Sequence, residues 1–349
     1  MPCEPKTLGS VGVFTSMLVE PSDTTDPCQP ATFDSSSERY EILQENIRYT
    51  DVLLGGNGFT GTIDRTAVHT RHGARVVVGS FVMEVGPYEL ASWLPRINGN
   101  AASGNTYAPA EEFDLSAFDI MMKRDQGTVI YRHCGVRSAT FNAVSSVGGP
   151  EQVMRMTIEI IGFEEHDATF PATPPRLPVS DRLYWILGDG QLQLQADPTA
   201  SVPAPQNQEW YFDSFSLRID NNLTPILRNF HNVTAIQSRG REVTFRASMP
   251  YDNGVNAQNG GSHSPLYIDF FKGNGTLSFL STKSDELQEI HPNYSTVISL
   301  NDLRSIRRTP NATGPGEVPL FLDMKAHRAG GATAQDPSIP PISITNVVA

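Results

Sequence analysis

Two histidines and a glycine-rich stretch are the residues whose types and spacing most suggest chemistry. His69 and His72 lie in the charged segment "HTRH", and the stretch "GGNGFTG" occupies 55–61. Zinc proteases present two histidines on one helix, and phosphate-binding glycine loops lead into a helix. Here both features lie between strand-like segments. We therefore expect His69 and His72 to face solvent and the glycine-rich stretch to bind no phosphate.

Paired carboxylates are the other candidate chemistry, at Glu111-Glu112 and Glu164-Glu165. Adjacent residues of a strand point to opposite faces, so neither pair can act as an acid/base couple on one substrate. The sequence also contains no GxSxG elbow and no Walker loop. It therefore predicts no catalytic residues, no metal site and no cofactor, and we expect a protein that is not an enzyme.

Composition favours a protein built from many short strands. The chain has 349 residues, including 28 glycines and 26 prolines, which is typical of turn-rich β structure. Its formal net charge of −12 argues against binding nucleic acid through phosphates. No 18-residue apolar stretch and no signal-peptide pattern are present, so we expect neither membrane insertion nor secretion. Three cysteines without CxxC spacing suggest reduced thiols and assembly inside a cell, with a Cys3–Cys28 disulfide across the N-terminal arm as the alternative.

Four regions follow from the patterning. Residues 1–39 are polar and proline-punctuated, which predicts an extended arm. Residues 40–165 and 181–349 are rich in strand patterns, and 166–180, with four prolines, read as a linker between two domains. Each domain is expected to have its own core.

The elements expected inside the two domains are mostly strands. In 151–164, Val153, Arg155, Thr157 and Glu159 alternate with apolar residues, so one sheet face should be polar. A short helix is expected at 86–99, because Pro87 suits a first turn and Gly99 a C-terminus. A second helix is expected at 284–290. The remaining expected strands are 40–54, 59–66, 75–85, 113–124, 127–134, 136–146, 213–220, 241–249, 265–272, 276–280, 316–328 and 342–348.

The two domains also share an order of features. "GTIDRT" (61–66) aligns with "LRIDNN" (217–222), and "RVVVGSFVMEV" (75–85) with "REVTFRASM" (241–249). Toward the end of each domain, "GGPEQVMRMTIEIIG" (148–162) aligns with "TGPGEVPLFLDMKAH" (313–327). Matches in the same order indicate a tandem duplication.

The motifs suggest a family. The run "IRYTDVLLGGNGFTGTIDRT" with the later "GPYELASWLPRING", and in the second half "FDSFSLRIDNNLTPI" and "GREVTFRASMPYDNG", resemble tail tube (major tail) proteins of long-tailed bacteriophages, of the two-domain type. The resemblance covers 40–349. It departs from the family pattern in the long 251–264 loop and the proline-rich linker.

That resemblance implies a mainly β fold with two tandem related β-sandwich domains, each flanked by a short α-helix. It implies rings of three copies, as pseudo-hexamers, that stack into a tube and conduct double-stranded DNA without specific binding. Tape measure, terminator and distal tail proteins are the implied partners. The implied location is the virion tail, assembled in the host cytoplasm, with no membrane partner.

The residues expected to face the lumen are the polar ones on four strands of these domains, where arginines among carboxylates would offer phosphates no fixed partner. They are Glu84, Arg155, Thr157, Glu159, Glu242, Thr244, Arg246, Glu317 and Asp323. The loops 55–74 and 220–240 and the arm 1–39 are expected to contact neighbouring rings or subunits. The residues expected to make those contacts are Asp64, Arg65, Arg71, Arg75, Asp220, Arg239 and Arg241.

Two other classes remain open on the residues alone. Trp93, Trp185, Trp210 and ten tyrosines would suit a carbohydrate- or receptor-binding β-sandwich, although aromatic residues in β proteins mostly belong to the core. A β-sandwich hydrolase is disfavoured because no catalytic constellation is present.

Overall fold

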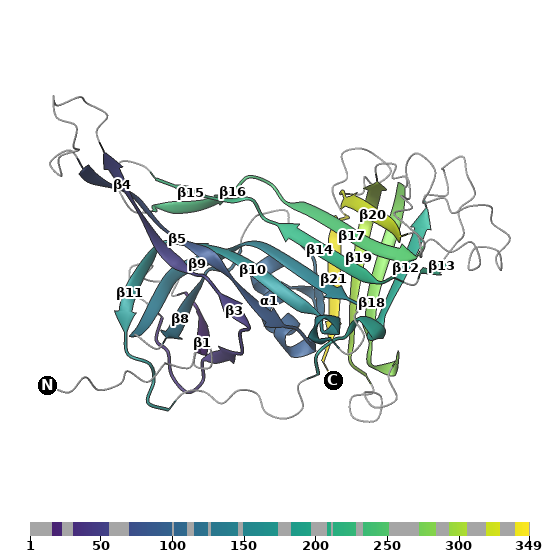
Figure 1. Ribbon diagram of the computed structural model, residues 1–349, viewed down its shortest axis with the longest axis horizontal. Helices are drawn as coiled ribbons and strands as arrows, with labels where there is room; N and C mark the ends of the chain where they lie inside the picture. The colour runs from purple at the N-terminus through teal and green to yellow at the C-terminus, as the bar shows by residue number, and fades with distance from the viewer. Residues whose placement is uncertain are drawn as a thin grey trace, which may run out of the picture.

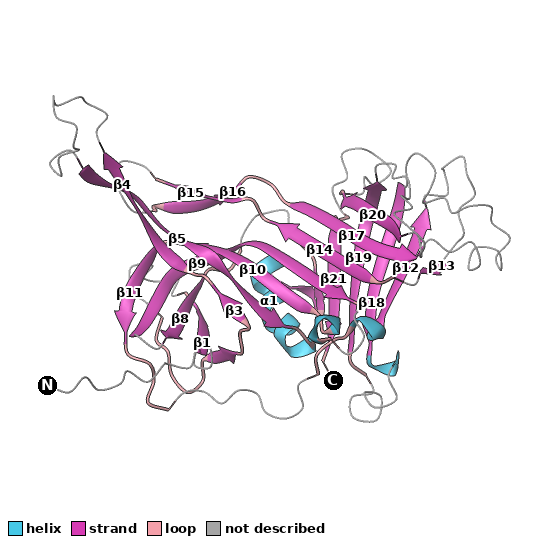
Figure 2. Cartoon of the chain, in the orientation of Figure 1, coloured by secondary structure: helices cyan, strands magenta, loops and turns pink. Residues whose placement is uncertain are grey.

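The computed structural model shows a mainly β protein, as predicted. It describes residues 16–22, 31–55, 70–99, 101–109, 115–124, 127–145, 149–173, 183–196, 208–210, 212–227, 233–250, 272–283, 293–305, 319–328 and 339–348. In this part of the chain the single α-helix is α1, Pro87–Asn98, and three short 3-10 turns lie at Pro150–Gln152, Leu187–Asp189 and Ser281–Lys283. Figure 2 shows strands dominating both ends of the molecule. No helix of the described residues is long and apolar enough to cross a membrane.

The strands divide between a first half, up to residue 173, and a second half, from residue 183. The first half contains β1 (Ser16–Pro21), β2 (Glu38–Tyr40), β3 (Gln44–Glu45), β4 (Arg48–Gly55), β5 (Thr70–Glu84), β6 (Ala101–Ser103), β7 (Thr106–Tyr107), β8 (Phe118–Arg124), β9 (Gly127–Val144), β10 (Arg155–Gly162) and β11 (Glu164–Ala168). The second half contains β12 (Gly190–Ala196), β13 (Gln208–Trp210), β14 (Ser214–Asp220), β15 (Leu223–Ile226), β16 (Ala235–Ser238), β17 (Glu242–Pro250), β18 (Lys272–Leu280), β19 (Ser295–Ser305), β20 (Pro319–Ala326) and β21 (Ile342–Val347).

The two halves pair their strands in the same order. In the first half, β5 lies between β4 and β10, β10 also pairs with β9, and β9 pairs with β8 and β11. In the second half, β17 lies between β14 and β20, β20 also pairs with β19, and β19 pairs with β18 and β21. The next strands correspond too. In the first half β1 pairs with β8 and β2, and in the second half β12 pairs with β18 and β13.

This order corrects one part of the sequence alignment. The sequence aligns 217–222 with 61–66, but the strand that contains 217–220, β14, occupies the position of β4. Strand β4 pairs with β5 in the first half as β14 pairs with the equivalent strand β17 in the second. Residues 59–66 lie outside the described residues, as do the helix expected at 284–290 and the strand expected at 265–271.

Strand β9 is the bent element of the first half. We expected two strands in a hairpin at 127–134 and 136–146, but the structure has one continuous strand. It turns at His133, whose φ of 49° is a left-handed conformation, and passes from the β8 and β11 side to the β10 side. Strand β19 turns in the same way at Asp302, with φ of 41°. A left-handed residue lets a long strand serve two sheets, so its unusual conformation has a structural use.

The halves are joined edge to edge by β9 and β14. The antiparallel register runs from Ser138 opposite Asp220 to Val144 opposite Ser214. One sheet therefore continues from β4 through β5, β10, β9, β14, β17 and β20 to the end of β19, which Figure 1 shows as the sheet that spans the molecule.

The core is also continuous across this junction, which corrects the expectation of two separate cores. One cluster of buried side chains includes Trp93 and Phe141 of the first half and Phe215, Phe245 and Trp185 of the second. Because the cluster crosses the seam, the apolar face of the shared sheet is buried along its length.

Helix α1 confirms the prediction at 86–99 and lies at the seam. Pro87 opens it, Glu89 accepts a hydrogen bond of 3.0 Å from the Gly86 N–H, and the face with Trp93 is buried. The Pro87 carbonyl accepts a 2.7 Å hydrogen bond from Asn346 of β21. The first-half helix therefore packs against a strand of the second half.

Three other expectations need correction. The arm at 1–39 contains β1 and the first residues of β2, and Met17 of β1 is fully buried in the hydrophobic core. The linker at 166–180 begins inside β11, which pairs with β9. In the loop at 55–74, Gly55 belongs to β4 and residues from Thr70 onward belong to β5, so the hairpin is longer than predicted.

Candidate functional site

The exposed face of the shared sheet is the most distinctive surface of the described residues. On β10 the side chains of Met156 and Ile158 are buried, whereas Arg155, Thr157 and Glu159 point to the other side. This is the alternation predicted for 151–164, and β14 and β17 continue it with the same burial period. A sheet with one apolar and one polar face results.

The strand registers assemble the predicted lumen residues into rows on that face. Residues directly opposite one another on neighbouring strands point to the same side of a sheet. One row reads Asp323, Arg246, Ser216, Asn142, Arg155, Glu84. The next reads Lys325, Thr244, Arg218, Thr140, Thr157, Val82, and the third reads Glu242, Asp220, Ser138, Glu159, Ser80.

We call these three rows the polar face. It brings together every predicted lumen residue that is described, because only Glu317 lies outside the described residues. Two strands that sequence reasoning had not assigned to it, β9 and β14, form its centre. Their alternating "ATFNAV" (139–144) and "SFSLRID" (214–220) carried the signal, and Arg218 is the charged residue missed by leaving β14 out.

Three cations of the polar face lie close to carboxylates, within one strand or across strands. Arg218 lies 2.9 Å from Asp220 and 3.7 Å from Glu159, measured from guanidinium nitrogen to carboxylate oxygen. Arg246 lies 3.4 Å from Asp323. Lys325 lies 2.5 Å from Glu242.

Each of these cations therefore already has a carboxylate within reach. Exposed pairs of this kind add little stability, but at Arg218, Arg246 and Lys325 they place a carboxylate where a phosphate would otherwise bind.

The polar face is hollowed along its centre. A groove of about 760 Å³ is lined by Thr140, Asn142, Ser216, Arg246 and Phe321, among others. A second hollow of about 450 Å³ continues it along Arg218 and Glu242. Phe321 is 55% exposed at the rim. The lining of the larger groove combines hydroxyl, amide and charged groups with apolar side chains such as Val144, Phe215 and Leu322.

The residues predicted to contact neighbouring subunits are not gathered in one place. Asp220 belongs to the polar face. Arg71 and Arg75 lie on β5, opposite Leu54 and Asp51 of β4. Asp64 and Arg65 fall outside the described residues.

Two arginines precede β17. Arg239 is exposed, whereas Arg241 donates a 2.7 Å hydrogen bond to the side chain of Asn221. Burial lowers the pKa of Arg241 to about 10. Its guanidinium thus serves a contact within the chain.

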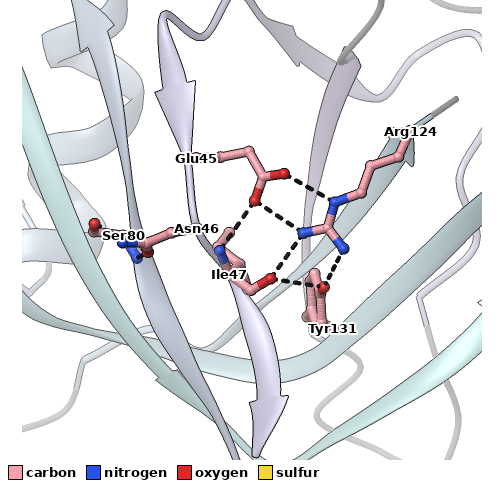
Figure 3. Close-up of polar contacts among 6 residues, drawn as sticks. All are labelled: Glu45, Asn46, Ile47, Ser80, Arg124 and Tyr131. Atoms are coloured by element: carbon pink, nitrogen blue, oxygen red, sulfur yellow. Dashed lines mark hydrogen bonds and ion pairs between the residues drawn. The ribbon is translucent and has the colours of Figure 1, made fainter. Parts of the chain in front are cut away.

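The edge of the sheet at β3 and β4 is fixed by a polar cluster that Figure 3 shows. Arg124 of β8 makes a two-pronged ion pair with Glu45, each N–O distance being 2.8 Å, and donates to the Ile47 carbonyl at 2.7 Å. Tyr131 of β9 donates to the same carbonyl at 3.1 Å. Burial raises the pKa of Tyr131 to about 12, so it stays a hydroxyl donor at neutral pH.

The reason the edge strand needs this anchor lies at Gly79 of β5. Its φ is 155°, and a side chain there would meet the Ile47 Cα at 2.5 Å. The edge strand therefore lies unusually close to β5 between β3 and β4. Asn46 completes the contact by accepting a 2.6 Å hydrogen bond from the Ser80 N–H.

The described residues offer little for catalysis. No group of three or more histidines, cysteines, aspartates or glutamates among them is arranged to hold a metal ion. Cys134 is fully buried, and burial raises the pKa of its thiol well above the ordinary value. Such a thiol is a poor nucleophile. The most extended surface of the described residues is therefore the polar face.

The fold is thus a long sheet with one buried and one polar face, built from two halves with the same strand order. The chain matches the model of the phage tail tube protein family over residues 24–326, and it belongs to that family. It is therefore a structural component of the phage tail. No curated protein matches it.

Proposed function

We propose that three copies of this protein close into a ring of six related domains, and that the rings stack into the tail tube that conducts DNA. The observation that supports this most is the shared strand order of the two halves, which also suggests that the chain arose by tandem duplication. In this ring, the junctions between copies would use the same kind of antiparallel strand pairing that joins β9 to β14 within the chain.

The two ends of the shared sheet suit ring closure. Among the described residues, β4 has a strand neighbour on one side only, β5, whereas its equivalent β14 has β17 and β9. The end of β19, after its turn at Asp302, is equivalent to the part of β9 that follows His133 and pairs with β14. Joining β19 of one copy to β4 of the next would remove the open edges that otherwise invite aggregation.

In this ring the polar face lines the lumen. Arg218, Arg246 and Lys325 are already paired with carboxylates, and the groups between them are mostly serine, threonine and asparagine. DNA phosphates would meet many weak contacts and no strong one, so the duplex can slide. No specific recognition of DNA and no catalysis are needed for this role.

Contacts between rings are assigned to the projecting hairpins. In Figure 1, the β4–β5 hairpin and the β15–β16 hairpin extend toward the same end of the molecule. We propose that they reach the adjacent ring, with Asp64, Arg65, Arg71 and Arg239 contributing. Residues 1–15, which precede β1, are the part of the arm left for this role. Tape measure, terminator and distal tail proteins are the proposed further partners, and assembly is proposed to occur in the host cytoplasm.

A carbohydrate-binding role is less well supported. Aromatic platforms for sugars must be exposed, and Trp93 and Trp185 are fully buried. No other described feature favours that function.

Electron microscopy of the purified chain tests the ring. We expect rings with three-fold symmetry and stacked tubes. Discrete monomers at all protein concentrations would contradict the proposal.

The lumen assignment is tested by Glu159→Lys combined with Glu242→Lys. These changes remove the carboxylates beside Arg218 and Lys325 and add two positive charges to the polar face. Tubes should still form, and DNA passage should slow in a salt-dependent way. Asp167→Lys, on the exposed part of β11, is the matched control and should leave passage unchanged. Normal DNA delivery by the double variant would rule out this lumen.

A further inference from the structure

The two halves can be aligned residue by residue through their registers, starting at the turns of the long strands. His133 of β9 and Asp302 of β19 are the left-handed residues at those turns. Two positions after each turn, the strand pairs with Ile161 of β10 and with Lys325 of β20. Ile161 and Lys325 are therefore equivalent positions.

Two residues before these positions lie Glu159 and Asp323, which are therefore equivalent carboxylates on the polar face. Opposite them stand Ser80 of β5 and Arg246 of β17. Ser80 of β5 and Arg246 of β17 are therefore equivalent positions as well.

Two residues before Ser80 and Arg246 are Val78 and Thr244. The residue opposite Val78 is Arg48 of β4, and the residue opposite Thr244 is Arg218 of β14. Arg48 of β4 and Arg218 of β14 are therefore equivalent positions of the two halves.

The neighbouring residues agree with this match, although they played no part in deriving it. The residues before the two arginines, Ile47 and Leu217, are both buried and aliphatic. Three residues after Arg48, Asp51 lies opposite Arg75. Its equivalent, Asn221, pairs with Arg241.

Within the chain, these positions are linked across the junction of the halves. Arg218 of the second half lies 3.7 Å from Glu159 of the first half, with β9 between their strands. The ion pair therefore spans the seam rather than one domain.

We infer that Arg48 of one copy forms the equivalent ion pair with Asp323 of the next copy, at the junction between subunits. This inference rests on the proposed ring and names the side chains that join its members. Arg48 is exposed on the strand whose outer edge has no neighbour among the described residues. Asp323 lies beside Arg246, whose side chain is 68% exposed, so the carboxylate would stand between two arginines.

The test is a charge exchange in the full chain. Arg48→Glu and Asp323→Arg each place like charges together at every subunit junction, and the combined variant restores an opposite-charge pair. An exposed pair is worth up to about 1 kcal/mol, or about fivefold in an equilibrium constant. We therefore expect each single variant to need several-fold more protein to form rings, up to about fivefold for the loss of one pair, measured by sedimentation velocity. The combined variant should recover most of that loss relative to Asp323→Arg alone.

The in-chain pair supplies the matched control. Arg218→Glu and Glu159→Arg alter the equivalent contact inside one chain, so they should change the thermal midpoint of dissociated protein more than the concentration needed for rings. Asp323→Arg also places a positive charge beside Arg246, but this effect is common to the single and combined variants.

Ring formation by the unaltered chain distinguishes a failure of the inferred ion pair from a failure of the proposed ring. If rings form and Arg48→Glu assembles like wild type, or the combined variant is no better than Asp323→Arg, the inferred pair is wrong and the ring stands. If the unaltered chain forms no rings, both are wrong.

Discussion

The side-chain amide of Asn221, in the second half, donates a 3.0 Å hydrogen bond to the main-chain carbonyl of Ile97, in the helix of the first half. The same amide donates to the Val136 carbonyl at 3.0 Å, and its oxygen accepts from Arg241 at 2.7 Å. Asn221 is fully buried. The Asn221 side chain therefore connects helix α1, strand β9 and the residue before β17 at the junction of the two halves.

Replacing Asn221 by alanine should destabilise the fold strongly. The carbonyls of Ile97 and Val136 and the part-buried Arg241 guanidinium would each lose a hydrogen bond, and each unsatisfied buried group costs about 1–3 kcal/mol. We expect the free energy of unfolding in urea to fall by about 2–4 kcal/mol. Ser216→Ala, on the polar face, is the control and should change stability by less than about 0.5 kcal/mol. Equal effects of the two substitutions would show that Asn221 does not hold the seam.

Strand β1 makes a prediction about truncation. A chain lacking residues 1–15 keeps β1 and should melt as the full chain does. A chain lacking residues 1–30 loses a strand paired with β2 and β8 and should fail to fold cooperatively. Because Met17 is fully buried, Met17→Ala should cost about 2–5 kcal/mol. Circular dichroism melting curves distinguish these cases, and an unchanged melt of the longer truncation would contradict the role of β1.

Sequence patterns identified the elements whose signals are local. The strand at 155–162 shows strict alternation, and the helix at 87–98 has a proline start and an apolar face, so both could be predicted. The polar residues of β10, β17 and β20 followed from the same alternation, and the structure places them on one face.

The rest depends on contacts that leave no local pattern. β1 falls in the one short apolar patch of the arm, Val11–Val19, but a patch of that length does not show that its strand pairs with β2 and β8 and buries Met17. The sequence predicts separate strands at 127–134 and 136–146, whereas the chain bends at the left-handed residue His133 and continues as one strand. The pairing of 138–144 with 214–220 joins segments far apart in sequence, and without it Arg218 cannot be placed beside Glu159.

The polar cluster at the sheet edge predicts that Arg124 is not replaceable by lysine. Its planar group bridges both Glu45 oxygens and the Ile47 carbonyl, and an ammonium group cannot make that fork. We expect Arg124→Lys to lower the free energy of unfolding by about 1–3 kcal/mol and Tyr131→Phe by about 1 kcal/mol. Arg304→Lys is a matched control, because Arg304 makes a similar fork with Asp302 while its side chain is 57% exposed.

That control should cost less than about 0.5 kcal/mol, since exposed pairs contribute little. If Arg124→Lys costs no more than Arg304→Lys, the cluster does not anchor the edge strand.

The turn at His133 predicts a pH dependence of stability. Burial lowers the pKa of His133 in the folded protein, so the unfolded chain, with an ordinary value of about 6.5, binds the proton more readily. Stability linked to this group is therefore full above about pH 6.5 and is lost as the pH falls toward the folded-state pKa. The slope cannot exceed about 1.4 kcal/mol per pH unit for one group.

His133→Asn isolates this contribution, because asparagine tolerates the left-handed conformation that residue 133 adopts. The backbone N–H at this position, which donates to Asp119 at 2.8 Å, is retained in the variant. We expect its free energy of unfolding in urea to vary less between pH 7 and about pH 5.5 than that of the unaltered chain. His327→Asn, at an exposed site, should leave the pH profile parallel to wild type. If His133→Asn shows the wild-type slope, the buried imidazole at the turn is not the source of acid sensitivity.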